Sequence, residues 1–267
     1  MTPGLHDDIP EAEYHADTVS LSVSGAKTLL KSPARFIWER EHPVHKDVFD
    51  FGTAAHALAL GDSLDHIYVT PFDDFRTKAA QEEKKAAQAD GLAVLTGADW
   101  LTVCDMAEEI SQHPMAGTLL DGGRREVSGY AVDEETGVMR RCRVDYLRDD
   151  LAIDYKTTRN ADPNAFARDA ATFGYHMQHA WYLDLIRDLG HDARSFVFIA
   201  QEKEPPYLVS VVELVAPAVD LGRNRNRLAL QAFRDCTESN TWPGYPERVV
   251  PIDVPTWAYY DNPLEYA

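Results

Sequence analysis

Cysteine is scarce in this chain of 267 residues, and its scarcity limits the metal sites that the sequence could hold. The three cysteines, Cys104, Cys142 and Cys236, lie far apart. Zinc and iron–sulfur sites need clustered cysteines, and three scattered ones cannot form such a set by themselves. We therefore expect no iron–sulfur cluster, and we expect these thiols to be small buried side chains.

Long hydrophobic runs are also missing. No apolar stretch approaches the roughly 20 residues that span a membrane. The N-terminus lacks the charged-then-apolar pattern of a signal peptide. We therefore expect no membrane association and a cytoplasmic location.

Basic residues are in deficit, with 26 lysines and arginines against 44 acidic residues and a net charge of −18. This balance argues against a protein that coats nucleic acid non-specifically. It leaves open an enzyme with a basic channel on an acidic body, since local potential decides binding. It also leaves open an acidic partner-binding protein. Arginines cluster locally in three groups: Arg124 and Arg125; Arg140, Arg141 and Arg143; Arg223, Arg225 and Arg227.

Hydrophobic residues make up 45% of the chain, which is enough for a core, and no internal repeat or low-complexity linker divides it. We expect one domain over residues 1–267, with a mainly helical part (1–122), a sheet with helices (123–214) and a C-terminal helix and tail (215–267). An aromatic tail from Trp242 should pack on the body or on another subunit. The opening, to about residue 22, should be irregular. The patterns predict helices at 24–38 (kinked or split by Pro33), 51–60, 77–90 and 96–113, another from 162, and two more at 175–189 and 217–236. They predict one strand from 124 and others at 141–147, 151–157, 195–200 and 207–214.

Residues 141–157 are predicted to form two strands joined by a polar turn at 148–150. On the first, Cys142, Val144 and Tyr146 alternate with charged residues; on the second, Leu151, Ile153 and Tyr155 do so. If the apolar faces are buried together, Asp145, Asp154 and Lys156 emerge on one surface. Two carboxylates and an ammonium can hold a hard cation and orient a water. The alternative is an exposed sheet face with ordinary surface charges.

Two helical segments carry further candidates. His56 lies among small residues that let a neighbour approach closely, and it is either a core histidine or a metal ligand. Tyr175, Gln178 and Tyr182 share one face of the later helix. The opposing face is expected to be core and consists of Met177, Trp181 and Leu185.

This pattern resembles the PD-(D/E)xK nuclease superfamily, in which an Asp on one strand precedes an Asp-x-Lys on the next. The helix Gly52-Thr-Ala-Ala-His56 is similar to the Gly-x-x-x-His helix of RecB-type nucleases, and Tyr175-x-x-Gln178-x-x-x-Tyr182 to their later motif. Several phrases resemble the nuclease domain of exonuclease VIII, the RecE family: Leu21-Ser-Val-Ser-Gly-Ala with Ser32-Pro33, Phe75-Arg-Thr-Lys and Gly174-Tyr-His-Met-Gln178.

The resemblance implies a PD-(D/E)xK (restriction-endonuclease-like) α/β core, a mixed sheet flanked by helices with a helical N-terminal elaboration. It implies a Mg²⁺-dependent exonuclease, with Mn²⁺ as a substitute, that degrades linear double-stranded DNA from its ends in the 5′–3′ direction. The single strands so made would serve phage-type recombination with a RecT-like annealing protein. The chain would form a ring-like homo-oligomer, in the bacterial host cytoplasm if it is phage-encoded.

The resemblance also implies roles for individual residues. His56, Asp145, Asp154 and the carbonyl of Tyr155 would bind the metal, and Lys156 would orient or deprotonate the attacking water. Further roles fall to Glu126, a direct or water-mediated ligand, and to Gln178 and Tyr182, which would contact the scissile strand or support Lys156. The expected DNA contacts are Arg141, Arg143, Tyr175 and Gln178. Two alternatives stay open: a structure-specific or endonucleolytic enzyme with the same core, and a non-catalytic DNA-binding relative.

Overall fold

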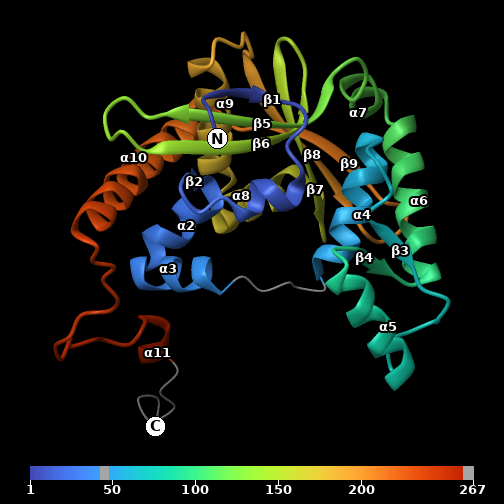
Figure 1. Cartoon of the computed structure of the whole chain (residues 1–267), viewed down its shortest axis with the longest axis horizontal. Helices are drawn as coiled ribbons and strands as arrows, with labels where there is room; N and C mark the ends of the chain where they lie inside the picture. Colours follow the sequence, from blue (N-terminus) through green and yellow to red (C-terminus); the bar gives the residue numbers. More distant parts are fainter. Residues whose placement is uncertain (43–47, 261–267) are drawn as a thin grey trace.

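A mixed sheet organises the chain in the computed structural model, which describes residues 1–42 and 48–260 (Figure 1). Its strand order is β1-β5-β6-β7-β8-β9, with β2 parallel to β6. β5, β6 and β7 form an antiparallel meander, β7 and β8 are parallel, and β9 returns antiparallel to β8. This arrangement confirms the predicted mixed central sheet. The bounds are β1 (Gly4–His6), β2 (Leu21–Ser22), β5 (Arg124–Val132), β6 (Met139–Leu147), β7 (Leu151–Thr158), β8 (Ser195–Glu202) and β9 (Val209–Glu213).

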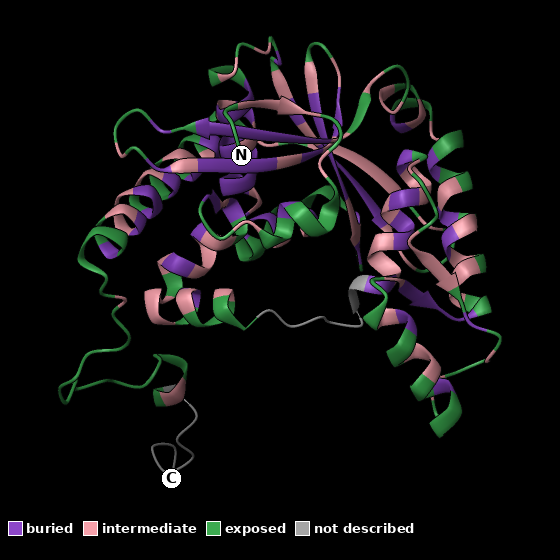
Figure 2. Cartoon of the chain, in the orientation of Figure 1, coloured by how far each residue is buried: buried purple, intermediate pink, exposed green. Residues whose placement is uncertain are grey.

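Helices cover both faces of the sheet, so its central strands are buried on two sides (Figure 2). One core cluster lies under α2 (Val23–Lys31), α3 (Pro33–Glu41), α8 (Pro163–Phe173), α9 (Tyr175–Asp188) and α10 (Ala216–Ser239). The other lies under α4 (Val48–Leu60) and α6 (Gly97–Gln112). The remaining elements are α1 (Glu11–Ala16), α5 (Lys78–Ala89), α7 (Pro114–Leu119), α11 (Trp257–Tyr260) and the parallel pair β3 (Ile67–Val69) with β4 (Ala93–Leu95).

The N-terminal segment is not irregular, contrary to the prediction. β1 pairs with β5 along three residues, and α1 follows it. α2 begins at Val23, one residue before the predicted start of this helix, because the Ser22 hydroxyl caps it by accepting the N–H of Gly25. Pro33 splits the predicted helix rather than kinking it: it stands in the first turn of α3, where a missing N–H does no harm.

The predicted alternation on β6 is wrong in one respect. Cys142 and Val144 join the core cluster under α9, whereas Tyr146 joins the cluster under α4 and α6 with Ile153 and Tyr155. The change of face falls where the ladder is interrupted, because β5 and β6 pair on either side of Glu126 and Asp145 but not between them, and the Glu126 backbone is left-handed there. With helices on both faces, the charged residues also do not stand on an exposed sheet surface.

α9 is buried on most of its circumference and is packed closely by α10. Its predicted core residues Met177 and Trp181 are 2% exposed. α10 reaches α9 at Gly222, where a Cβ atom would lie 2.0 Å from the carbonyl oxygen of His176. Asn226 of α10 donates to the carbonyl of Met177 at 2.9 Å. α9 is therefore fixed between the sheet and α10, and its side chains are held rigidly.

The C-terminal tail divides at Trp242. This ring stacks on Phe36 at 5.5 Å and meets Phe233 edge-on, so the tail begins packed on the body as predicted. Beyond it the chain leaves the body (Figure 1), and Ile252 is 90% and Trp257 69% exposed. Packing of these later residues on another subunit stays a prediction. No helix in the described part of the chain is long and apolar enough to cross a membrane.

His179 of α9 should make the fold acid-sensitive. Its Nδ1 is buried with no hydrogen-bond partner among the described residues, and its ring packs on Phe196. Burial lowers the pKa of His179 to about 4, although Glu213 opposes the shift. The unfolded chain takes up this proton near pH 6.5 and the folded chain near pH 4. Stability is therefore fully present above about pH 6.5 and declines between about pH 6.5 and 4, by up to about 3 kcal/mol.

Urea unfolding of the His179→Leu variant at pH 7 and pH 5 measures this contribution. The variant should lose less stability than wild type between the two values. The same substitution at His42, which is exposed, is the control and should leave the pH difference unchanged. An identical loss in wild type and His179→Leu would contradict the assignment.

Candidate metal and catalytic site

The candidate site lies where β6 and β7 separate. These strands pair only through Tyr146 with Ile153 and Leu147 with Ala152. Beyond these two pairs, the N–H of Tyr155 on β7 donates to a side chain of β6 instead of a backbone carbonyl. Its acceptor is Oδ2 of Asp145, at 2.8 Å. The carboxylate thus occupies the gap between the two strands.

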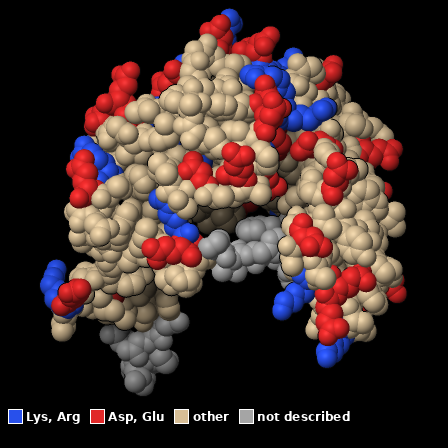
Figure 3. All heavy atoms as spheres, in the orientation of Figure 1, with Lys and Arg blue, Asp and Glu red and all other residues tan. Residues whose placement is uncertain are grey.

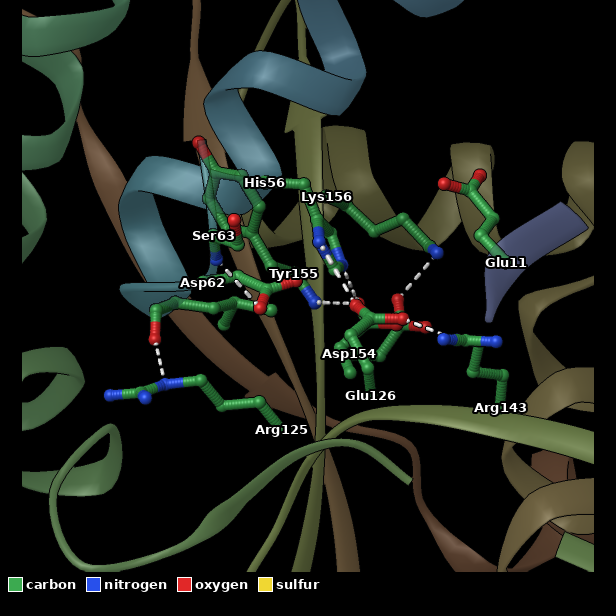
Figure 4. A network of polar contacts seen from close by, with 12 residues as sticks. Glu11, His56, Asp62, Ser63, Arg125, Glu126, Arg143, Asp154, Tyr155 and Lys156 are labelled. Atoms are coloured by element: carbon green, nitrogen blue, oxygen red, sulfur yellow. Dashed lines mark hydrogen bonds and ion pairs between the residues drawn. The ribbon is translucent and has the colours of Figure 1, made fainter. Parts of the chain in front are cut away.

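His56 brings α4 onto this carboxylate. Its Nε2 lies 2.9 Å from Asp145 Oδ2, and its Nδ1 lies 3.3 Å from Oε1 of Glu126. The small residues around it are buried as expected, including Ala55 and Ala57. The structure therefore places His56 between two carboxylates rather than in a purely apolar core (Figure 4).

Glu126 reaches this position through an unusual backbone. Its φ of 51° lies in the left-handed region, and its neighbours Arg125 and Val127 pair with β6 while Glu126 does not. Such a conformation costs about 1–3 kcal/mol in a non-glycine residue and is found preferentially at functional sites. Arg143 holds the side chain, with Nε donating to Oε2 at 2.7 Å.

Together these residues fit a divalent metal ion. His56, Glu126 and Asp145 each offer one ligand atom, and these atoms lie within 4.8 Å of one another. Two carboxylates with one imidazole suit Mg²⁺ or Mn²⁺, which prefer oxygen ligands and tolerate nitrogen to different degrees. Glu126 is thus one of the three residues that could hold the ion. Whether it would bind the ion directly or through water stays open, as the resemblance left it.

A second polar group lies beside the cluster. Asp154 is 1% exposed, and its Oδ1 accepts a hydrogen bond of 2.5 Å from Nε2 of Gln178. Its Oδ2 forms an ion pair with Nζ of Lys156 at 2.5 Å. Asp154 is outside the three-residue cluster, so its role as a metal ligand stays a prediction, as does that of the Tyr155 carbonyl. The Tyr155 hydroxyl turns the other way and donates to Gln201 at 2.7 Å.

Mutual burial shifts the protonation of these groups. Burial and then Asp145 raise the pKa of Glu126 to about 7 and that of Asp154 to about 6. Burial would also raise the pKa of Asp145, but His56 lies against it and keeps its pKa below the ordinary value. For His56, burial favours the neutral ring, yet Asp145 and Glu126 outweigh burial and raise the pKa to about 9. At neutral pH the imidazolium therefore neutralises the Asp145 carboxylate.

The two arginines expected to contact DNA are bound within the fold. Arg141 donates to the carbonyl of Asp17 and lies 3.4 Å from its carboxylate. Arg143 binds Glu126 and the carbonyl of Ile9. Both guanidinium groups also lie over the ring of Tyr14, at 4.9 and 5.4 Å. Their contact with DNA stays a prediction, and it must now compete with these internal partners.

Two arginines of the third group are likewise paired. On α10, Arg223 binds Asp184 and Asp220, and Arg227 binds Asp133. Acidic side chains are spread widely over the face shown in Figure 3, with basic ones between them, as the net charge of −18 requires. Any contact of basic side chains with an anionic ligand is therefore confined to a small part of the surface.

A cavity of about 790 Å³ opens beside the cluster. Tyr182 lines it, whereas Tyr175 lies beside Lys156, whose Nζ is 5.4 Å from its ring centroid. Part of the wall comes from α1, through Glu11 and Tyr14. No local pattern in the sequence indicates this wall, because the pairing of β1 with β5 positions it.

Comparisons with known proteins identify the family and agree with the fold. A family model described as a PDDEXK-like domain of unknown function (DUF3799) matches residues 22–252. A solved structure of a candidate exonuclease from Eubacterium rectale superposes with a TM-score of 0.63 at 13% identity, covering 95% of this chain and 98% of that one. An alkaline exonuclease from Laribacter hongkongensis matches with a TM-score of 0.26 at 12% identity, over 72% of this chain and 96% of that one. No curated protein sequence matches.

Metal affinity at this cluster should rise with pH. A bound cation must displace the proton of His56, whose pKa is about 9, and that of Glu126, whose pKa is about 7. Affinity for Mn²⁺ should therefore increase between pH 6 and pH 9, by up to about tenfold per pH unit for each proton displaced. Calorimetry in buffers of different ionisation enthalpy measures the protons released.

His56→Gln removes the titrating group with the higher pKa of these two, so metal affinity should rise less steeply near pH 9. Asp150→Asn, in the exposed turn between β6 and β7, is the matched control and should behave as wild type. An affinity that does not change between pH 6 and pH 9 would show that the ion binds elsewhere.

Proposed function

Because the chain belongs to the PDDEXK-like domain family (DUF3799), we propose that it is a Mg²⁺-dependent exonuclease acting on the ends of linear double-stranded DNA. The observation that supports this most is the cluster of His56, Glu126 and Asp145 beside the Asp154–Lys156 pair. Phosphodiester hydrolysis needs charge neutralisation at the phosphate and an activated water, and these two groups serve those needs.

The chain's own residues make the site rigid before any substrate enters. Asp145 is fixed by the N–H of Tyr155, Glu126 by Arg143, and Asp154 by Gln178. A divalent ion held here would supply charge neutralisation at the phosphate and would make a nearby water more acidic. Mn²⁺ should be able to substitute for Mg²⁺ in the reaction, because Mn²⁺ accepts an imidazole ligand more readily than Mg²⁺ does.

Lys156 has the properties of a proton donor and orienting group. Burial opposes its positive charge, but Asp154 and Asp145 outweigh burial and raise the pKa of Lys156 above its ordinary value. A lysine held in its charged form donates hydrogen bonds to a water or a phosphate oxygen and does not accept a proton. Of the two roles implied by the resemblance, this favours orientation of the water over its deprotonation by Lys156.

Action at strand ends comes from the RecE resemblance, since a cavity lined by α1, α2, α4 and the sheet does not by itself distinguish a terminus from an uninterrupted duplex. The 5′–3′ direction, the supply of single strands to a RecT-like annealing protein and the ring-like assembly come from the RecE resemblance and are part of the proposal. A structure-specific or endonucleolytic enzyme would use the same metal chemistry, and a non-catalytic relative would bind DNA without cutting it.

Release of nucleotides from linear duplex, compared with closed circular duplex of the same sequence, tests the proposal. Magnesium-dependent release from the linear form alone is expected, and a chelator should abolish it. Cleavage of closed circles would establish an endonuclease instead. Binding without cleavage of either form would leave the non-catalytic relative.

Variants of the site should separate its roles within the same assay. Lys156→Ala should reduce cleavage about 100-fold or more while metal binding persists, because the ammonium holds no ion. Asp145→Asn should reduce both cleavage and metal affinity, because an amide is a poorer ligand for a hard cation. Asp150→Asn again serves as the matched control. Wild-type cleavage by Asp145→Asn would overturn the assignment of the site.

Assembly should depend on the exposed tail. Ile252 and Trp257 expose large apolar surfaces beyond the packed Trp242, and such surfaces are normally covered by a partner. Light scattering at micromolar concentration should give a mass that is a multiple of 29.9 kDa. Replacing both residues by serine should lower that mass, whereas Glu247→Ala should not. A monomeric wild-type protein would exclude the proposed ring.

A further inference from the structure

Lys27 of α2 lies next to the catalytic pair, on a part of the site that the metal chemistry does not use. Its aliphatic stem packs against Gly174, whose backbone is left-handed with φ 68°; a Cβ there would lie 3.1 Å from Cε of Lys27. Its ammonium lies 5.8 Å from the ring centroid of Tyr175, and Nζ of Lys156 lies 5.4 Å from the same centroid. Two ammonium groups therefore share one tyrosine ring.

The two lysines differ in their anionic partners. Asp154 binds Lys156 at 2.5 Å. Within residues 1–42 and 48–260, no carboxylate lies within ion-pair distance of Lys27. Burial and then the neighbouring Lys156 together lower the pKa of Lys27 to about 8, and Asp154 only partly compensates. A half-buried cation without a counter-ion and beside a like charge destabilises the folded chain.

The two arginines beside the cavity are already bound to carboxylates of the protein: Arg143 holds Glu126, and Arg141 lies 3.4 Å from Asp17. Lys203 also lines the cavity, but its ammonium lies over the ring of Phe51. Lys27 thus differs from the two arginines and from Lys156 in having charge that the fold leaves uncompensated. Such a charge at the edge of a site is a common sign of an anionic ligand, because the missing partner arrives with the substrate.

We propose that Lys27 binds a phosphate group of the DNA, and that this phosphate lies beside the phosphate that reacts at Lys156. The inference rests on the proposed nuclease function and adds a substrate-binding residue to it. Gly174 has a part in this arrangement, since a Cβ there would lie 3.1 Å from Cε of Lys27 and would displace the stem. The two ammonium groups lie 5.8 and 5.4 Å from the centroid of the Tyr175 ring, so both phosphate contacts would be made beside the same side chain.

The test compares Lys27→Met with Lys27→Arg. Methionine keeps the length and the apolar packing of the stem but has no charge, whereas arginine keeps the charge. Binding of a fluorescent linear duplex is measured by anisotropy with calcium in place of magnesium, over a range of salt concentrations. Lys31→Met, one turn further along α2 and exposed, is the matched control.

Lys27→Met should weaken duplex binding about tenfold and reduce the slope of log K against log salt by about one unit, the contribution of one phosphate contact. Lys27→Arg should retain most of the affinity. In urea, Lys27→Met should be more stable than wild type, because the uncompensated cation is gone. A lysine with a merely structural role would give a less stable variant and an unchanged salt slope.

The outcomes also separate this inference from the proposed function. Wild-type protein that cleaves linear duplex, together with a Lys27→Met variant that binds as wild type with the same salt slope, would overturn the role of Lys27 alone. Wild-type protein that neither binds nor cleaves duplex would overturn the proposed function, and the role of Lys27 with it. Loss of binding in Lys27→Met but not in Lys31→Met supports both.

Discussion

The hydrogen bond from the N–H of Tyr155 to the Asp145 carboxylate is the contact on which the rest of the site depends. It ends the β6–β7 ladder and fills the gap with a charge instead of a backbone group. That charge attracts His56, which brings α4 against the sheet, and through His56 it fixes Glu126. One carboxylate thereby joins three elements that are distant in the sequence.

Because helices cover both faces of the sheet, the charges of the site are shielded from water and interact more strongly with one another. Asp154 is nearly inaccessible to solvent, and a carboxylate in such surroundings must be neutralised by a proton or a cation. Lys156 is that cation for Asp154, to which Gln178 adds a hydrogen bond, and His56 has the same part for Asp145. The acidic surface of the molecule is therefore compatible with binding an anionic polymer, since the potential inside the site differs from that outside it.

Short-range alternation and turn residues were sufficient to predict most helices and the residues on the two central strands, whereas the mixed sheet was implied by the family resemblance. The sequence also singled out His56 and Gln178, which the structure brings to Asp145 and Asp154. The left-handed backbone of Glu126 could not be predicted, since it follows from strand packing and not from residue type. The contacts of Arg141 with Asp17 and of Arg143 with Ile9 were missed for a related reason, because these partners lie more than 120 positions earlier in the chain.

The manner in which β1 is attached has a consequence for access to the cavity. β1 is an edge strand joined to β5 by three residue pairs, and it leads directly into α1, which forms part of the cavity wall. Besides these pairs, Arg141 and Arg143 hold the segment through Asp17, Ile9 and Tyr14. An edge segment of this kind opens locally at a lower free energy than the whole fold. The width of the entrance should therefore depend on the two arginines, and amide hydrogens of the first sixteen residues should exchange ahead of those in the central strands.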